Sequence, residues 1–157
     1  DWYRKAGESG CECGHVLAYS LGGQARDLEN AATLGDMSAM LRLAEEKLDA
    51  ACQFRSPWGE NDYEREGFES ALYWYDCASE DGSLEATLLL AEIYDGSWHT
   101  RPPERWSCQS STGDRLARAL EYYERAGAQG WKFATQEIER IHKQLDRIDQ
   151  GTEPDDE

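Results

Sequence analysis

Residues 71–96, ALYWYDCASEDGSLEATLLLAEIYDG, contain two helical patterns joined by a glycine. The small, apolar and aromatic residues of each half recur at helical spacing, as Ala71, Tyr75 and Ala78 and then as Leu84, Leu88 and Ala91. Residues at this spacing share one face of a helix. Because Gly82 tolerates a left-handed backbone and Ser83 can cap a following helix, the stretch predicts a tight helical hairpin.

The same pattern recurs elsewhere when the central glycine is used as the origin. Gly130 lies 48 positions after Gly82, and Gly35 lies 47 positions before it. The residues in register are Tyr122, Tyr123, Ala126, Ala134 and Ile138 in the later copy and Ala31, Ala39, Leu43 and Ala44 in the earlier one. An incomplete copy, with Trp2, Tyr3, Ala6 and Gly10, begins the chain. Small residues recur where neighbouring helices approach closely, so the copies predict stacked hairpins.

The central unit fits the pattern WYxxAxxxGxxxAxxxLAxxY, with Trp74, Tyr75, Ala78, Gly82, Ala86, Leu90, Ala91 and Tyr94 at its fixed positions. This pattern resembles the Sel-one-like repeats, which are relatives of the tetratricopeptide repeats, over most of residues 1–141. The resemblance implies an all-α solenoid of stacked antiparallel helix pairs with a concave inner surface. It implies no single activity, since such repeats serve as scaffolds, adaptors, secretion factors and inhibitors.

A single elongated domain is expected over residues 1–150, because a chain of 157 residues can bury one substantial core. Residues 151–157, GTEPDDE, form an acidic tail with nothing to bury and are expected to be disordered. The sequence starts in the middle of a unit. We therefore expect the native N-terminus further upstream, and we draw nothing from the absence of a signal peptide.

Helical periodicity is interrupted by two polar stretches that contain proline, residues 54–67 and 97–113. Both are expected to be long loops on one edge of the stack, since they follow equivalent halves of their units. Outside the central hairpin, helices are predicted over residues 2–9, 12–21, 25–34, 37–52, 116–127 and 131–148. The last of these is expected to cap the stack with a polar outer face of Glu137, Arg140, Lys143, Gln144 and Arg147.

Charge restricts the partners of the chain. Thirty-two acidic and sixteen basic residues give a formal net charge of -16, which repels nucleic acid and anionic membrane surfaces. The longest apolar run, residues 86–94, is far shorter than the ~20 residues that span a bilayer. We therefore expect a protein partner of basic character, with neither nucleic-acid binding nor membrane insertion, and a monomer when the chain is free.

No catalytic residue, metal or cofactor is predicted. Cys11, Cys13 and His15 could begin a metal site, but no second ligand pair lies at suitable spacing, so a structural or disulfide role is favoured. The five cysteines leave the disulfide pairing open. The aromatic runs at residues 73–75 and 122–123 are assigned to the core and given no ligand role.

Aromatic residues of the two predicted loops are the candidate contact residues for a partner. Trp, Tyr and Arg often anchor protein interfaces. The candidates are Trp58, Tyr63, Trp98, His99, Arg105 and Trp106. Two alternatives stay open for the loop aromatics: they anchor a partner, or they fold back and cover the hairpin edges.

These features predict a protein-binding module without catalysis. The small, acidic and irregularly repeated chain is similar to Sel-one-like immunity proteins that inhibit phospholipase effectors of type VI secretion. That resemblance implies a periplasmic inhibitor of a basic toxin, with a cytoplasmic location as the alternative. The alternative functions are an adaptor in a secretion or signalling complex and an exported, enzyme-like protein that binds cell-wall compounds.

Overall fold

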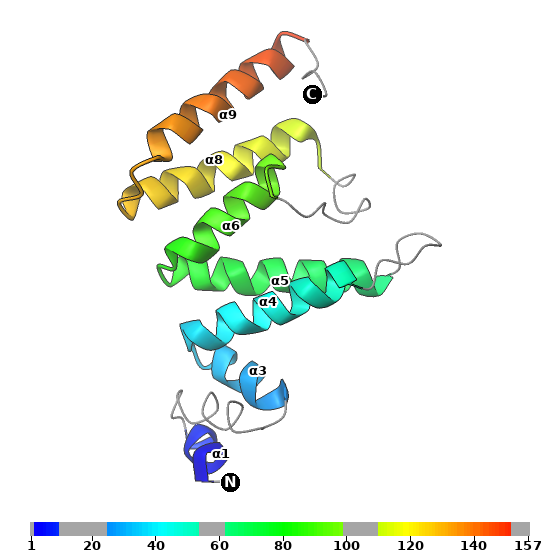
Figure 1. The fold of residues 1–157 in the computed structure, drawn as a ribbon, viewed down its shortest axis with the longest axis vertical. Helices are drawn as coiled ribbons and strands as arrows, with labels where there is room; N and C mark the ends of the chain where they lie inside the picture. The colour runs from blue at the N-terminus through cyan, green and yellow to red at the C-terminus, as the bar shows by residue number, and fades with distance from the viewer. Residues whose placement is uncertain (1, 10–24, 54–61, 99–109, 152–157) are drawn as a thin grey trace.

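A computed structural model shows an all-α fold whose helices follow one another along the long axis of the molecule (Figure 1). The structure describes residues 2–9, 25–53, 62–98 and 110–151, and these ranges contain no strand. Their helices are α1 (Trp2–Glu8), α3 (Ala25–Thr33), α4 (Met37–Gln53), α5 (Asp62–Glu80), α6 (Leu84–Asp95), α8 (Thr112–Ala128) and α9 (Ala134–Asp149). The predicted all-α class is confirmed.

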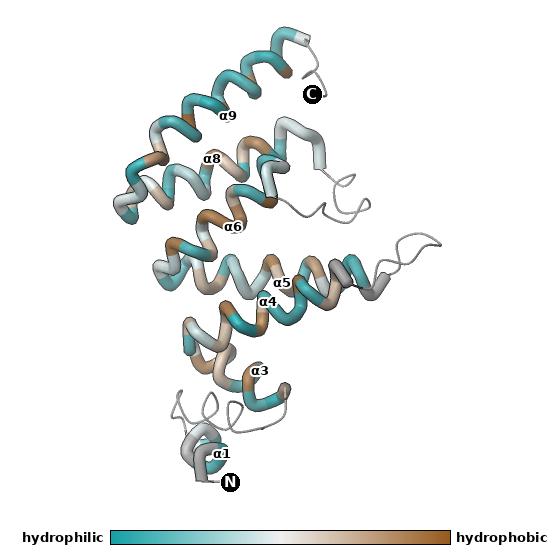
Figure 2. The backbone as a smooth tube through the Cα atoms, viewed as in Figure 1, coloured by the Kyte–Doolittle hydropathy of each residue, from teal (hydrophilic) through white to brown (hydrophobic). Residues whose placement is uncertain are grey.

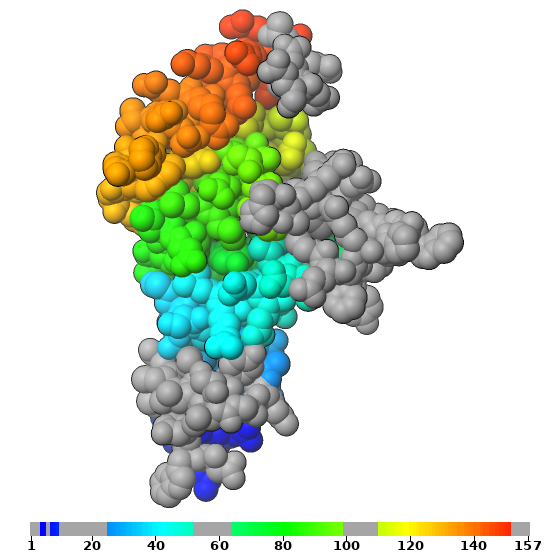
Figure 3. Space-filling model, viewed as in Figure 1, coloured from blue at the N-terminus to red at the C-terminus, as the bar shows by residue number. Residues whose placement is uncertain are grey.

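Each helix packs mainly against its neighbours in chain order. The extensive contacts join α3 to α4, α4 to α5, α5 to α6, α6 to α8 and α8 to α9, with a smaller contact between α1 and α3. Figure 3 shows the same succession on the surface, where the chain colours form consecutive bands. The hydrophobic core is therefore spread along the stack.

Helix α6 lies between two neighbours, α5 and α8. Its buried residues are Ala86, Thr87, Leu90, Ala91 and Ile93. Figure 2 shows hydrophobic residues concentrated along this helix, whereas α9 at the end of the stack is mostly hydrophilic. A helix that is covered on several sides needs apolar residues around much of its circumference, and a terminal helix needs them on one side only.

Gly35, Gly82 and Gly130 end three helices with the same turn. Their φ angles are 96°, 96° and 91°, in the left-handed region that favours glycine. The residue after each glycine donates its backbone N–H to a carbonyl five positions earlier: Asp36 to Ala31 at 3.0 Å, Ser83 to Ala78 at 2.9 Å and Trp131 to Ala126 at 3.0 Å. This bond defines the Schellman motif. The tight turn predicted at Gly82 is confirmed.

Alanines flank each of these glycines at the same sequence distance, four residues before and four after. The pairs are Ala31 with Ala39, Ala78 with Ala86, and Ala126 with Ala134, and all six are buried. A larger side chain at these positions would push the helices of a hairpin apart. The small residues of the predicted repeat are thus buried in each of the three hairpins.

Side-chain caps begin the second helix of two hairpins. Asp36 Oδ1 accepts the N–H of Ala39 at 2.8 Å, and Ser83 Oγ accepts the N–H of Ala86 at 3.3 Å. The third hairpin differs, because Trp131 stands at the position equivalent to Asp36 and Ser83 and its indole side chain cannot accept a hydrogen bond. The chain turns once more there, and α9 begins at Ala134, three residues later than predicted.

The predicted loop over residues 54–67 is wrong in its last part, because α5 begins at Asp62. Gly67, the last residue of the predicted loop, lies inside α5. A Cβ atom on Gly67 would be 3.4 Å from Ala51 Cβ of α4, so this glycine permits a close helix crossing. Residues 54–61 and the predicted helix over residues 12–21 lie outside the described part of the chain.

The second predicted loop, residues 97–113, also ends earlier than expected. Helix α8 begins at Thr112, four residues before the predicted start. Ser111 caps it: Ser111 Oγ accepts the N–H of Asp114 at 3.0 Å, and the Asp114 carboxylate accepts the N–H of Ser111 at 3.3 Å. This reciprocal capping box stabilises a polar helical start that hydrophobic periodicity does not reveal.

Gly82→Val is expected to lower the free energy of unfolding by more than ~1 kcal/mol, since a β-branched residue resists positive φ. No atom lies within 4 Å of a Cβ built on Gly82, so crowding cannot cause the loss. Gly82→Asn is the matched control, because asparagine tolerates the left-handed region better. Thermal melting of both variants tests whether the backbone conformation causes the loss of stability. If Gly82→Val is destabilised no more than Gly82→Asn, the positive φ angle is not the cause.

Candidate functional site

The structure describes only two of the six predicted contact residues. Trp58, His99, Arg105 and Trp106 lie outside the described part of the chain, so their role in partner binding stays a prediction. Tyr63 lies in the first turn of α5 and not in a loop. The shared edge predicted for the two loops also lies outside the described residues.

Trp98 is a core residue in the structure. It is only 8% exposed, and its ring centroid lies 6.4 Å from that of Phe68 on α5. Its backbone N–H donates to the Glu92 carbonyl at 3.0 Å, after Gly96 ends α6 with a φ of 83°. Trp98 therefore fits the covering alternative. The sequence did carry a signal, since an apolar residue soon after a helix-ending glycine often packs back on its helix.

Tyr73 is the residue for which the predicted core position is wrong. Its side chain is 61% exposed, whereas Tyr75 is buried and Trp74 is half-buried. Successive residues of a helix point about 100° apart, so three consecutive aromatics cannot all face one core. The Tyr73 ring stands edge-on to Trp74, with the centroids 5.2 Å apart.

An exposed face of α5 surrounds Tyr73, and we call it the α5 acidic face. It consists of Glu66, Glu69, Tyr73 and Glu80, all exposed and spaced along one side of the helix. The opposite side of α5 is packed into the core through Phe68, Ala71, Leu72, Tyr75 and Ala78. An exposed aromatic residue thus lies in a row of carboxylates.

Positive charge is sparse around the α5 acidic face, where Arg65 of the same helix lies directly before Glu66 and four residues before Glu69. Residues 66–98 contain eight carboxylates and neither lysine nor arginine. Among the described residues, the salt bridges to this segment come from Arg125 of α8 to Asp76, at 3.9 Å, and from Arg140 of α9 to Asp95. None of the described lysines or arginines forms a salt bridge with the acidic face itself. Its carboxylates are exposed to solvent.

A polar cluster joins α8 to α5. Tyr122 donates its hydroxyl hydrogen to Asp76 at 2.9 Å, and Arg125 donates to Ser79 Oγ at 3.0 Å. The Ser79 hydroxyl lies 2.8 Å from that of Thr87, where both are buried. Buried polar groups are costly without partners, so these bonds hold α8 to α5 through side chains.

A second polar cluster joins the last hairpin to the end of α6. The Asp95 side chain is fully buried and accepts hydrogen bonds from Tyr123 Oη at 2.7 Å, from the Ser97 N–H at 2.6 Å and from Arg140. Arg140 also donates to Glu137 at 2.6 Å. The prediction that Arg140 belongs to a polar outer face is wrong, because its guanidinium bonds the buried Asp95 carboxylate, and Glu137 of the same predicted face bonds Arg140.

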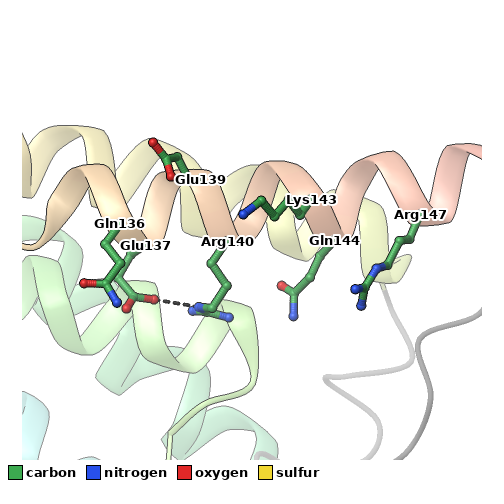
Figure 4. Close-up of a pocket in the computed structure, with 7 residues that line it drawn as sticks. All are labelled: Gln136, Glu137, Glu139, Arg140, Lys143, Gln144 and Arg147. Carbon is green, nitrogen blue, oxygen red and sulfur yellow. Dashed lines mark hydrogen bonds and ion pairs between the residues drawn. The ribbon is translucent and has the colours of Figure 1, made fainter.

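Polar residues of α9, Glu137 and Arg140 included, line a depression of about 360 Å³ (Figure 4). Its lining comprises Gln136, Glu137, Glu139, Arg140, Lys143, Gln144 and Arg147. Both charge signs are interspersed along it, and Arg140 is already bonded to Asp95 and Glu137. The depression therefore does not present one kind of charge to a ligand.

The tyrosines at the helix contacts have raised pKa values. Burial raises the pKa of Tyr122 and Tyr123 well above the usual value, and hydrogen bonds to Asp76 and Asp95 raise it further. Burial, together with the nearby Glu45 and Glu85, raises the pKa of Tyr75 to about 12. Burial alone would lower the pKa of Arg140, but bonds to Glu137 and Asp95 raise it, so this side chain stays charged.

The free energy of unfolding is expected to fall above pH ~10, where the tyrosines of the unfolded chain ionise while Tyr75, Tyr122 and Tyr123 in the folded chain remain protonated. These three tyrosines contribute their full stabilisation of the fold below the tyrosine pKa of the unfolded chain. The contribution is lost as the pH rises toward and through their higher pKa values in the folded chain. Urea unfolding between pH 8 and 11.5 measures the effect. Tyr122→Phe combined with Tyr123→Phe should flatten the alkaline decline, and an unchanged decline would contradict this origin.

Cysteines and acidic residues of the described part offer no metal site, since no group of three or more potential ligands comes together there. Cys77 is a free, half-buried thiol on α5. Cys11, Cys13 and Cys108 lie outside the described residues, so the disulfide alternatives stay open. No helix within the described ranges is both long and apolar enough to cross a membrane.

Comparisons with protein-family models, curated proteins and solved structures find no match to this chain. The resemblance to Sel-one-like repeats therefore stays a prediction that rests on the sequence pattern. Function has to be inferred from the geometry of the helices and from the surface they expose.

Proposed function

We propose that this chain is a solenoid of Sel-one-like helical hairpins that binds a protein partner. The observation that carries the proposal is the recurrence of one turn, at Gly35, Gly82 and Gly130, with the same hydrogen bond and the same buried alanines on either side. Contacts between helices that are adjacent in chain order also support it. Stacked hairpins expose long surfaces that are suited to holding another protein.

The contacts between the first helices of successive units also support a repeated stack. Asp76 lies six positions before Gly82 and bonds Tyr122, which lies eight positions before Gly130. Arg4 and Asp27 occupy the same positions relative to Gly10 and Gly35. Arg4 donates to both carboxylate oxygens of Asp27 at 3.1 Å. The same two positions therefore join α1 to α3 and α5 to α8. The first contact is a salt bridge between Arg4 and Asp27, and the second is a hydrogen bond from Tyr122 to Asp76.

Net charge indicates the character of the partner. A chain with a net charge of -16 attracts basic proteins over a long range and increases their association rate at low ionic strength. Affinity capture from an extract of the source cell, followed by calorimetry with each purified candidate, tests the proposal. We expect a basic partner whose affinity falls steeply with salt. If no captured protein binds the purified chain, the binding function is contradicted.

The specific form of this function is an inhibitor of a secreted toxic effector, acting in the periplasm. An acidic surface can imitate the charge of the phosphate-containing substrates that basic effectors attack. Co-expressing the chain with the product of the adjacent gene in a susceptible strain tests this form. Restored growth is the expected result. A harmless neighbouring gene product, or growth that is not restored, would favour the adaptor instead.

A further inference from the structure

We infer that the α5 acidic face, Glu66, Glu69, Tyr73 and Glu80, docks a segment of the protein partner that carries exposed arginine or lysine side chains. This inference rests on the proposed function, because it assigns the binding site of the same partner. A basic segment is expected here because it complements the negative charge of this face and can stack a cation on the exposed Tyr73 ring.

Tyr73 supplies a flat surface on which a cation can stack. Its side chain is 61% exposed, and the edge-on contact with Trp74 supports the ring from within its own helix. A guanidinium over a tyrosine ring gains electrostatic energy from the negative ring face, and arginine does this more often than lysine. The Tyr73 ring therefore offers a partner's arginine or lysine side chain both contact area and electrostatic attraction.

Carboxylates lie within reach of a cation seated on that ring. Glu69 precedes Tyr73 by four residues, a rise of about 6 Å along the helix, and Glu66 and Glu80 lie seven residues away on either side, at about 10 Å. A partner segment with several basic side chains can place one on the ring and others on these carboxylates. An acidic or purely apolar segment would gain neither contact.

The exposed aromatic residue is specific to this unit. At the position of Tyr73, nine residues before the glycine of each turn, α3 has Arg26 and α8 has Glu121. Both of these residues are exposed, like Tyr73 itself. Since the neighbouring units pack without an aromatic residue there, the packing of the hairpins does not require Tyr73.

Phe133 is the other largely exposed aromatic ring of the described residues, and it provides a comparison. Its side chain is 50% exposed, but the ring contacts Trp131 edge-on, and Lys132 Nζ lies 4.9 Å from its centroid. The chain itself thus supplies a cation for Phe133. Among the described residues no cation lies over the Tyr73 ring, and residues 66–98 contain neither lysine nor arginine, so the exposed ring can receive a cation from another molecule.

Binding of a short, fluorescein-labelled, arginine-rich peptide to the full chain, followed by fluorescence anisotropy, tests the inference. Tyr73→Ala is expected to weaken binding roughly fivefold, and Tyr73→Phe should retain most of it, because the ring is kept. Phe133→Ala is the matched aromatic control and should leave binding unchanged. Loss with Phe133→Ala equal to that with Tyr73→Ala, or no loss with Tyr73→Ala, would overturn the assignment.

Charge variants separate a local site from general attraction by an acidic protein. Glu69→Gln with Glu80→Gln is expected to weaken peptide binding about tenfold, which is about 1.4 kcal/mol. Glu45→Gln with Asp49→Asn removes the same charge from exposed positions of α4 and should change it less than about twofold. Equal losses in the two double variants would show attraction by net charge alone and overturn the inference.

The captured partner distinguishes failure of this inference from failure of the proposed function. If the partner binds the parent chain and Tyr73→Ala equally well, the site is wrong and the binding function stands. If the purified partner binds neither protein, the proposed function fails as well. Melting curves of all variants check the fold, and the exposed positions are expected to leave the midpoint nearly unchanged.

Discussion

Trp98→Ala is expected to lower the free energy of unfolding by about 3–5 kcal/mol, the range for truncating a large buried aromatic residue. Trp98 is 8% exposed and packs on Phe68, so its removal opens a cavity between α6 and α5. Urea unfolding measures the loss. Tyr73→Ala is the matched control, since it removes an aromatic ring that is mostly in solvent and should cost much less.

A melt of Trp98→Ala close to that of the parent would contradict the core position of this residue. Such a result, combined with weaker binding of the partner, would restore the alternative in which Trp98 anchors an interface. The opposite result, a large loss of stability with unchanged affinity of the remaining folded protein, is the one the structure predicts.

Asp95→Ala is expected to have the second largest effect, about 2–4 kcal/mol. The fully buried carboxylate satisfies Tyr123 and Arg140, and its removal leaves their polar groups without an acceptor. Because the Arg140 side chain is 38% exposed, water can replace part of the loss, which lowers the expected value. Tyr123→Phe removes only one donor and should cost about 1 kcal/mol.

A double-mutant cycle between Asp95 and Arg140 isolates their interaction. We expect the losses from Asp95→Ala and Arg140→Ala to be strongly non-additive, because each removes the partner of the other. Additive losses would show that the salt bridge does not join the last hairpin to α6. The surface pair of Arg42 and Glu46 on α4, at 3.6 Å, serves as a control with little expected coupling.

The three turns could be predicted from the sequence because their chemistry is local. A glycine at the end of a helix and an alanine four residues to either side define each turn within nine residues, and in two of the three Asp36 or Ser83 also caps the next helix. The positions of most helices follow from the same periodicity. Where the cap is a reciprocal pair of polar groups, as at Ser111, the apolar pattern says nothing about the start of the helix.

Contacts between distant residues could not be predicted in this way. Arg140 and Asp95 are 45 residues apart, and nothing in the sequence around either distinguishes them from other charged residues. The sequence places Gly67 in a loop, and only its close approach to Ala51 explains why a glycine stands inside α5. The sequence places Trp98 in a loop as well, and only its contact with Phe68 shows that it belongs to the core.

The candidate binding surface was missed for a related reason. A repeat pattern assigns Tyr73, Trp74 and Tyr75 to the core together, although helix geometry permits only part of such a run to face inward. The exposed position of Tyr73 and the charges around it became visible only when each residue of α5 was assigned to a side of the helix.

Amide hydrogen exchange, measured on the free chain and on its complex with the purified partner, tests the account most directly. Binding of a basic segment to the α5 acidic face predicts slower exchange in residues 66–80, with smaller changes in α9. Unchanged exchange across α5, with slowing confined to other helices, would contradict it.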